Sequence, residues 1–356
     1  MRLQKPVLTL IVVSQFLCTS VWFASNAVIE NMRLFFGLNL NALGHLTSAI
    51  QLGFIIGTLI FAIFTISDRF SPSKVFFISA VLVALFNFGI LWNNHNLTSL
   101  IVLRFFTGFF LAGIYPVGMK IAADYFEKGL GKSLGLLVGA LVIGTAFPHL
   151  LNGISYSFSW KFIFIMTSLL SIAGGLMMLL LIPDGPFRKP SQRFDLSAFF
   201  KVFKNPSCRS SSLGYLGHMW ELYAMWGWIY AYSTSAMQTG LSLSNVSILA
   251  FSVIAFGAPG CVIAGLLSDK IGRCYTTSIM LTLSGVSALM IGCFFTGPSW
   301  VFIMIALIWG FSVVADDGGL WVNPQLLANP ACAYLGGCGR SHPVAVYHLV
   351  DRRLLS

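Results

Sequence analysis

Residues 265–274 read GLLSDKIGRC, and they place an acid and two bases in a short turn that follows a long apolar stretch. Only 9% of the 356 residues are charged, so such a turn needs a physical reason. A weaker copy, TISDRFSPSK, occupies residues 65–74, and its Asp68 precedes Asp269 by 201 residues. A fixed interval between similar features indicates an internal repeat.

The composition predicts a protein whose main solvent is lipid. Hydrophobic residues make up 57% of the chain, and 9% charged residues compare with about 25% in soluble domains. The formal charge of +10 fits Lys and Arg collected in cytoplasmic loops better than nucleic-acid binding. The seven cysteines are odd in number and scattered, which favours neither a disulfide framework nor a metal site. We expect a lipid bilayer as partner, no nucleic acid and no cofactor.

A spanning helix needs about 20 mostly apolar residues. The basic start of the chain is interpreted as the first span and not as a cleaved signal, because further long apolar segments follow it. The ten expected spans are residues 7–28, 44–66, 75–92, 98–119, 133–151, 161–182, 213–237, 245–267, 275–295 and 299–315.

These spans predict an all-α integral membrane protein in four parts. An N-terminal six-helix bundle covers 1–182, and a cytoplasmic linker rich in Pro, Ser and basic residues covers 183–212, with a short amphipathic helix around 195–204. An incomplete C-terminal bundle of about four helices covers 213–315, and a tail covers 316–356.

The distribution of basic residues predicts the orientation. With a cytoplasmic N-terminus, the inner segments carry fifteen Lys and Arg residues, and the outer joins carry only Arg33 and Lys161. Because cytoplasmic loops are enriched in these residues, we expect the N-terminus inside.

The interval of 201 residues relates the two halves. It maps span 7–28 onto 208–229, span 44–66 onto 245–267 and span 75–92 onto 276–293. Two halves related by an axis along the membrane normal are a transporter design, with the substrate site between the halves near the midplane.

Three motifs make residues 5–315 resemble the major facilitator superfamily. The cytoplasmic signature of that family matches at Gly265, Asp269, Lys270, Gly272 and Arg273. Its fourth-helix pattern is similar to LIVLRFFTGFFLAG, which contains Arg104 and Gly108. Its fifth-helix gate motif is similar to GKSLGLLVGALVIGTAFP, which contains Gly131, Gly135, Gly139, Gly144 and Pro148. The chain looks most like bacterial permeases grouped loosely with nitrate/nitrite and other anion carriers, but spans 44–66 and 245–267 lack the arginines of the nitrate carriers.

The resemblance implies a gate role for the Asp of each charged turn, which would hold cytoplasmic helix ends together in the outward-open state. The alternative is a tight turn that only fixes the orientation. The first copy departs from the signature at Phe64, Ser71 and Pro72. A latch there would rest on Asp68 and Arg69 alone.

Ionisable groups inside hydrocarbon are costly and are therefore functional candidates. We expect Arg104 to bind an anionic solute or to tune a proton site, or alternatively to extend to the outer interface. In the seventh span, GYLGHMWELYAMWGWIYAY, His218 and Glu221 share one helical face with Met225 and Trp228. We interpret His218 and Glu221 as a proton-coupling pair; a structural hydrogen bond is the alternative, and a metal site is disfavoured because no further ligands cluster there.

Other residues are candidates for the transport pathway. Tyr223 belongs to the aromatic group of the seventh span, and Trp22 and Asn26 are four residues apart in the first. Tyr115 precedes Pro116, which can interrupt the fourth helix beside the pathway. The glycines at 131, 135 and 139 step by four and allow either sliding or static close packing of a neighbouring helix.

Together these features predict a monomeric secondary active transporter in a bacterial inner membrane. It would move a small polar or anionic solute by alternating access, coupled to protons. No Walker loop supports ATP drive. The alternatives are an inactive truncated fragment, or a membrane enzyme, for which no His/Asp or Ser/Lys constellation is present.

The repeat also predicts where the last helices should lie. An eleventh span is expected near 334–352 and a twelfth at 362–383, but LGGCGRSHPVAVYHLVDRR occupies the eleventh position. Charged residues at a span centre cost roughly 2.5–3.5 kcal/mol each. We therefore expect a frameshift or similar disruption near 316–320.

Overall fold

The computed structural model describes residues 4–126, 130–154, 159–188 and 206–315. Every regular element in these ranges is a helix. The expected amphipathic helix at 195–204 and the expected tail at 316–356 lie outside the described residues, so both stay predictions.

The N-terminal half provides the six expected spans, two of them broken. Its helices are α1 (Gln4–Thr19), α2 (Ala24–Ala27), α3 (Ile29–Phe36), α4 (Ala42–Ile63), α5 (Ile66–Arg69), α6 (Pro72–Gly89), α7 (Leu97–Leu111), α8 (Tyr115–Tyr125), α9 (Leu130–Ile154) and α10 (Lys161–Leu181). The first span is divided into α1 and α2, and the fourth into α7 and α8.

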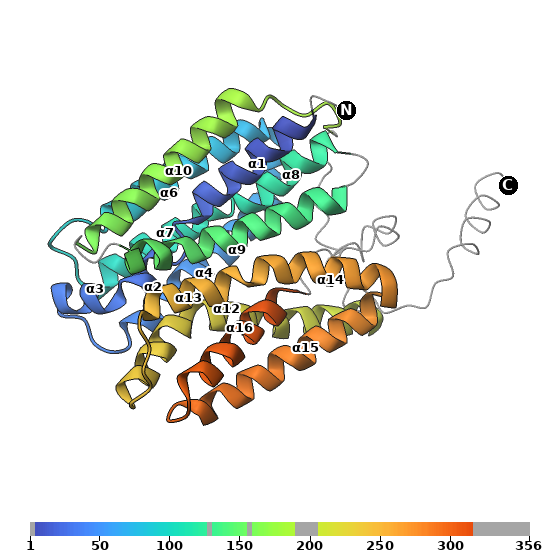
Figure 1. The fold of residues 1–356 in the computed structure, drawn as a ribbon. Helices are drawn as coiled ribbons and strands as arrows, with labels where there is room; N and C mark the ends of the chain where they lie inside the picture. The colour runs from blue at the N-terminus through green and yellow to red at the C-terminus, as the bar shows by residue number, and fades with distance from the viewer. Residues whose placement is uncertain (1–3, 127–129, 155–158, 189–205, 316–356) are drawn as a thin grey trace.

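The C-terminal half provides four further spans. Its helices are α12 (Pro206–Gln238), α13 (Val246–Ala255), α14 (Gly257–Ile271), α15 (Arg273–Met290), the short 3₁₀ helix η1 (Ile291–Phe294) and α16 (Ser299–Ala315). Seven helices in the described ranges are long and apolar enough to cross a membrane, and two apolar helices are shorter. Figure 1 shows the helices from α1 to α10 as one group and those from α12 to α16 as another beside it.

Each half packs its second spanning helix tightly on its fourth through glycine. In the N-terminal half, Gly53 and Gly57 of α4 and Gly108 of α7 lie so close to the facing helix that an added Cβ would collide with a backbone carbonyl oxygen. In the C-terminal half, Gly260 of α14 and Gly310 of α16 do the same. Small residues permit this close approach of helices in lipid. The shared arrangement relates the two halves in space as the interval of 201 residues relates them in sequence.

The two halves meet along a surface that we call the seam. It is formed by α2 and α9 of the N-terminal half and by α12, α13 and α14 of the C-terminal half. Figure 1 shows α9 lying along α13 and α14 at this boundary. The seam holds the candidate pathway.

Candidate functional site

The break in the first span brings Arg104 to the backbone between α1 and α2. The end of a helix leaves carbonyl groups without intrahelical partners. Arg104 of α7, fully buried, donates through Nη2 to the carbonyl oxygen of Trp22 and through Nη1 to that of Val21, at 3.5 Å. A cation is favourable at the C-terminal end of a helix. Arg104 thus holds the broken segment inside the N-terminal half and does not extend to an interface.

Asn87 of α6 helps to hold the guanidinium of Arg104, and it was not among the predicted site residues. Its Oδ1 accepts from Arg104 Nη1 at 3.3 Å, and its Nδ2 donates to hydroxyl oxygens of Thr167 and Ser168 at 3.1 and 2.9 Å. The available signal was an amide inside the third apolar span, near its end.

At the centre of the seam, residues that correspond in the two repeats contact each other. Trp22 stacks on Tyr223, with ring centroids 6.0 Å apart and an interplanar angle of 24°. Asn26 Nδ2 donates to the carbonyl oxygen of Gly227 at 2.9 Å, across 201 residues of sequence. Trp22 and Tyr223 are separated by the same interval. Two equivalent positions can touch only beside the axis that relates them, so this axis passes between α2 and α12.

One face of α12 supplies the aromatic side of the seam. Tyr223, Trp226 and Tyr230 recur at helical spacing and therefore share a face. Trp226 packs against Phe23 at a centroid distance of 6.2 Å, and Tyr230 packs against His149 of α9 at 5.7 Å. Three candidates, Trp22, Asn26 and Tyr223, are thus brought together here.

Two further asparagine amides, which were not among the predicted site residues, bridge the halves near Ile154. This is the outer end of the seam in the predicted orientation. Asn152 Nδ2 donates at 2.8 Å both to the carbonyl oxygen of Ala27 and to Ser247 Oγ. Asn245 Nδ2 donates to the carbonyl oxygen of Gly153 at 3.0 Å. These two amides join the halves at the outer end of the seam, and Asn26 joins them at its centre.

Glu221 lies on another face of α12, inside the C-terminal half. Its Oε1 accepts from Trp309 Nε1 of α16 at 2.9 Å and from the hydroxyl of Ser284 on α15. His218 is buried, and its ring lies 6.3 Å from that of Tyr215. In the described ranges, no cluster of three His, Cys, Asp or Glu side chains could hold a metal. Tyr115 begins α8, directly after the interruption of the fourth span, and packs at the edge of the core.

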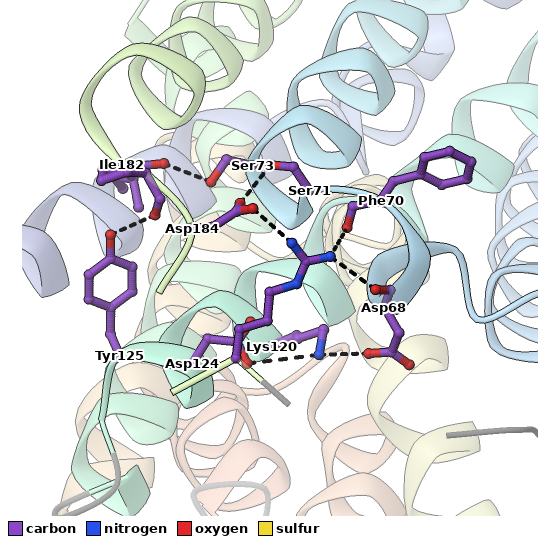
Figure 2. Close-up of polar contacts among 11 residues, drawn as sticks. Asp68, Phe70, Ser71, Ser73, Lys120, Asp124, Tyr125, Ile182 and Asp184 are labelled. Atoms are coloured by element: carbon purple, nitrogen blue, oxygen red, sulfur yellow. Dashed lines mark hydrogen bonds and ion pairs between the residues drawn. The ribbon is translucent and has the colours of Figure 1, made fainter. Parts of the chain in front are cut away.

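The first charged turn is the centre of a polar cluster on the N-terminal half. Lys120 Nζ lies 2.6 Å from Asp68 Oδ1 (Figure 2). Arg188 donates through Nη2 to the carbonyl oxygens of Asp68 and Phe70, at 2.9 and 2.7 Å. Arg69 instead donates to Thr65 Oγ1 at 3.1 Å. The expectation that Asp68 would act with Arg69 alone is therefore wrong, because the partners come from α8 and from the segment after α10, far away in sequence.

The same cluster binds the start of the predicted linker. Arg188 Nη1 forms an ion pair with Asp184 at 2.8 Å, and Ser71 Oγ donates to Asp184 at 2.6 Å. Ser73 Oγ donates to the carbonyl oxygen of Ile182 at 2.7 Å, as Figure 2 shows. Residues 183–188 therefore belong to the surface of the N-terminal half.

The second charged turn joins α14 to α15. Asp269 and Lys270 are exposed at the end of α14. Gly272 has φ +88°, a conformation that favours glycine, and Gly265 has open space beside it. The side chain of Arg273 lies outside the described residues.

The glycines of α9 face different surroundings. A Cβ at Gly135 or Gly139 would meet nothing within 4 Å, whereas one at Gly144 would collide with the hydroxyl of Thr19 on α1. Pro148 lies within the helix, one residue before His149. Around Gly131 the side-chain surroundings lie outside the described residues.

Comparisons with known proteins match residues 11–326 to the Major Facilitator Superfamily. The chain is 24% identical over 193 residues to a probable L-galactonate transporter of Escherichia coli K12, covering 49% of this chain and 42% of that protein. It is 22% identical to the bovine (Bos taurus) glucose-6-phosphate exchanger SLC37A2, covering 68% and 58%. The chain thus spans about half the length of these curated relatives.

Two solved structures have a similar fold. A bacterial homolog of the human lysosomal transporter Spinster, inward-facing and unoccupied, matches with a TM-score of 0.69 and 17% identity, over 94% of this chain and 80% of that chain. The xylose transporter XylE from E. coli, inward open, matches with a TM-score of 0.66 and 16% identity, over 93% and 86%.

Proposed function

The chain belongs to the Major Facilitator Superfamily, a family of membrane transporters and not of enzymes, and from this premise we propose that it carries a small polar or anionic solute along the seam by alternating access. The observation that carries the proposal is the contact between repeat-equivalent residues. Trp22 meets Tyr223, and Asn26 meets Gly227. A path on the axis between two halves is open to both membrane faces in turn when the halves rock.

The tightest glycine contacts, those against backbone carbonyl oxygens, lie within the halves, which supports rocking as two units. Within each half, glycine contacts bring helix backbones together and fix their packing. Along the seam, amide hydrogen bonds and ring contacts join the halves. Such contacts can separate without unfolding either half.

Proton coupling through Glu221 is the finer part of the proposal. Its carboxylate has Ser284 and Trp309 as hydrogen-bond donors, and neither donor carries a charge. Protonation of Glu221 would change how α12 packs on α15 and α16.

The relatives support the solute class. One is described as a transporter of a sugar acid and another as an exchanger of a sugar phosphate. Both names fit a small polar or anionic solute. The protein is a multi-pass membrane protein. We further propose that it is a monomer in a bacterial inner membrane, and the distribution of Lys and Arg supports a cytoplasmic N-terminus.

A cross-link across the seam tests the pathway. Asn152→Cys and Ser247→Cys, in a protein without its seven native cysteines, place thiols where the two side chains now form a hydrogen bond of 2.8 Å. In proteoliposomes, we expect oxidation to stop uptake and a reductant to restore it. Ser71→Cys with Asp184→Cys is the matched control, because both residues lie in the N-terminal half. Undiminished uptake by the seam-linked protein would contradict the proposal.

A further inference from the structure

The seam contains buried polar ring atoms without hydrogen-bond partners among the described residues. They are the indole Nε1 atoms of Trp22 and Trp226 and both ring nitrogens of His149. The side chains are at most 1% exposed. A buried donor or acceptor without a partner destabilises a protein, so these atoms are suited to a ligand that provides one.

These atoms belong to one continuous surface. The ring of Trp22 lies 6.0 Å from that of Tyr223, which lies 5.8 Å from that of Trp226. His149 packs on Tyr230, one helical turn after Trp226. The amide of Asn26 donates to the carbonyl oxygen of Gly227, the residue after Trp226. The surface crosses the axis between the two halves.

The chemistry of these groups restricts the ligand. An indole N–H only donates, whereas a neutral imidazole donates through one nitrogen and accepts through the other. A hydroxyl group can satisfy both kinds of partner, and several hydroxyls on one molecule can satisfy the whole set. The faces of Trp22 and Tyr223 bind an apolar ring surface. Glu221 faces α15 and α16, so it is not placed to bind a cation at this surface.

We propose that this part of the seam binds a hydroxylated ring, such as a sugar or a ring sugar acid. The ring inserts between Trp22 and Tyr223, and Asn26, Trp226 and His149 bind its oxygen atoms. This inference rests on the proposed function, because it uses the seam as the transport path. The two aromatic rings already touch, so the halves must separate before a solute enters, which links binding to rocking.

Binding to the purified full chain in detergent tests the ligand class. We expect D-glucose, D-glucuronate or myo-inositol to raise the thermal unfolding temperature, and the open-chain compounds mannitol and gluconate, together with nitrate and phosphate, to have no effect. The inference would be overturned if only open-chain compounds or inorganic anions raised the unfolding temperature, or if no compound did. The proposed function is tested separately, because the seam cross-link uses uptake of whichever solute the chain accumulates.

Two variants test the residues. Trp226→Phe and His149→Phe each keep an aromatic ring and remove the polar atoms. We expect each to weaken binding of the ring compound about threefold to tenfold, the range for the loss of one hydrogen bond. Trp220→Phe is the control, because its side chain on the same helix is 80% exposed. Equal affinity in the first two variants and the control would overturn the assignment, and either variant suffices if the other fails to fold.

Discussion

Arg104 shows how a single side chain determines the position of another. Its guanidinium binds the carbonyl oxygens of Val21 and Trp22, where the first span is broken. Asn87 holds the guanidinium from the other side. Because the backbone of Trp22 is fixed in this way, its ring is presented to Tyr223 on the axis. Arg104 therefore positions the ring of Trp22 at the seam from inside the N-terminal half.

Arg104→Lys should destabilise the protein by about 1–3 kcal/mol, because an ammonium group cannot replace the fork of donors that a guanidinium provides. The unfolding temperature in detergent measures this, and uptake should fall with it. Arg69→Lys is the matched control: Arg69 is exposed, with a local contact to Thr65. If Arg104→Lys were as stable and active as the unchanged protein, the positioning role would be wrong.

Glu221→Gln should remove the pH dependence of solute accumulation and leave the amount of folded protein unchanged. The amide keeps the size of the side chain and a carbonyl oxygen that can accept from Trp309, but it cannot bind and release a proton. Uptake at several external pH values measures the effect. Glu30→Gln is the control, because Glu30 pairs with Arg33 near the surface. An unchanged pH response would make Glu221 structural and place the proton site elsewhere.

At the residue scale, the sequence identified side chains better than their partners. Arg104 and Glu221 stand out because ionisable residues are rare in apolar spans. Their partners do not stand out, because a backbone carbonyl such as that of Trp22 has no sequence signal. Helical spacing alone predicted that His218, Glu221, Met225 and Trp228 share a face of α12. It could not predict which face of this helix contacts the N-terminal half, and that face carries Tyr223, Trp226 and Tyr230.

At the scale of elements, the two helix breaks differ in how well the sequence predicts them. The fourth span ends its first part at Leu111 and resumes at Tyr115, next to Pro116, and proline is a known signal for such a break. The first span breaks at residues 20–23, which contain neither proline nor glycine. There the contact with Arg104 stabilises the open turn, so tertiary structure overrides local preference.

Glycines that look equivalent in the sequence of apolar spans have different surroundings in the structure. Gly108→Ala should destabilise the protein by about 1–3 kcal/mol, because the added methyl group would collide with the carbonyl oxygen of Ile50. Gly139→Ala should leave the unfolding temperature unchanged or slightly raised, because that position faces open space and alanine favours a helix. Equal effects of the two substitutions on thermal unfolding in detergent would contradict this packing.

At the scale of the whole molecule, the interval of 201 residues was the most informative sequence feature. It predicted two related halves, and these halves meet at Trp22–Tyr223 and Asn26–Gly227, pairs separated by that interval. The polar cluster around Asp68 could not be predicted in the same way. Lys120 and Arg188 contact Asp68 because the fold brings α5, α8 and the segment after α10 together. These segments are far apart in the sequence.

The orientation of the whole molecule is tested with cysteines on its two sides. Cys293, exposed in η1, should lie at the outer end of the ninth span if the N-terminus is cytoplasmic. Lys270→Cys, at the exposed end of α14, should lie inside, as should the native Cys274. In proteins that keep one cysteine each, a membrane-impermeant maleimide should label Cys293 on intact cells, and the cysteine at position 270 only after permeabilisation. The reverse pattern would place the N-terminus outside, and labelling of both on intact cells would mean that the assignment of spans between them is wrong. A protein with Cys293 also replaced is the control for labelling elsewhere.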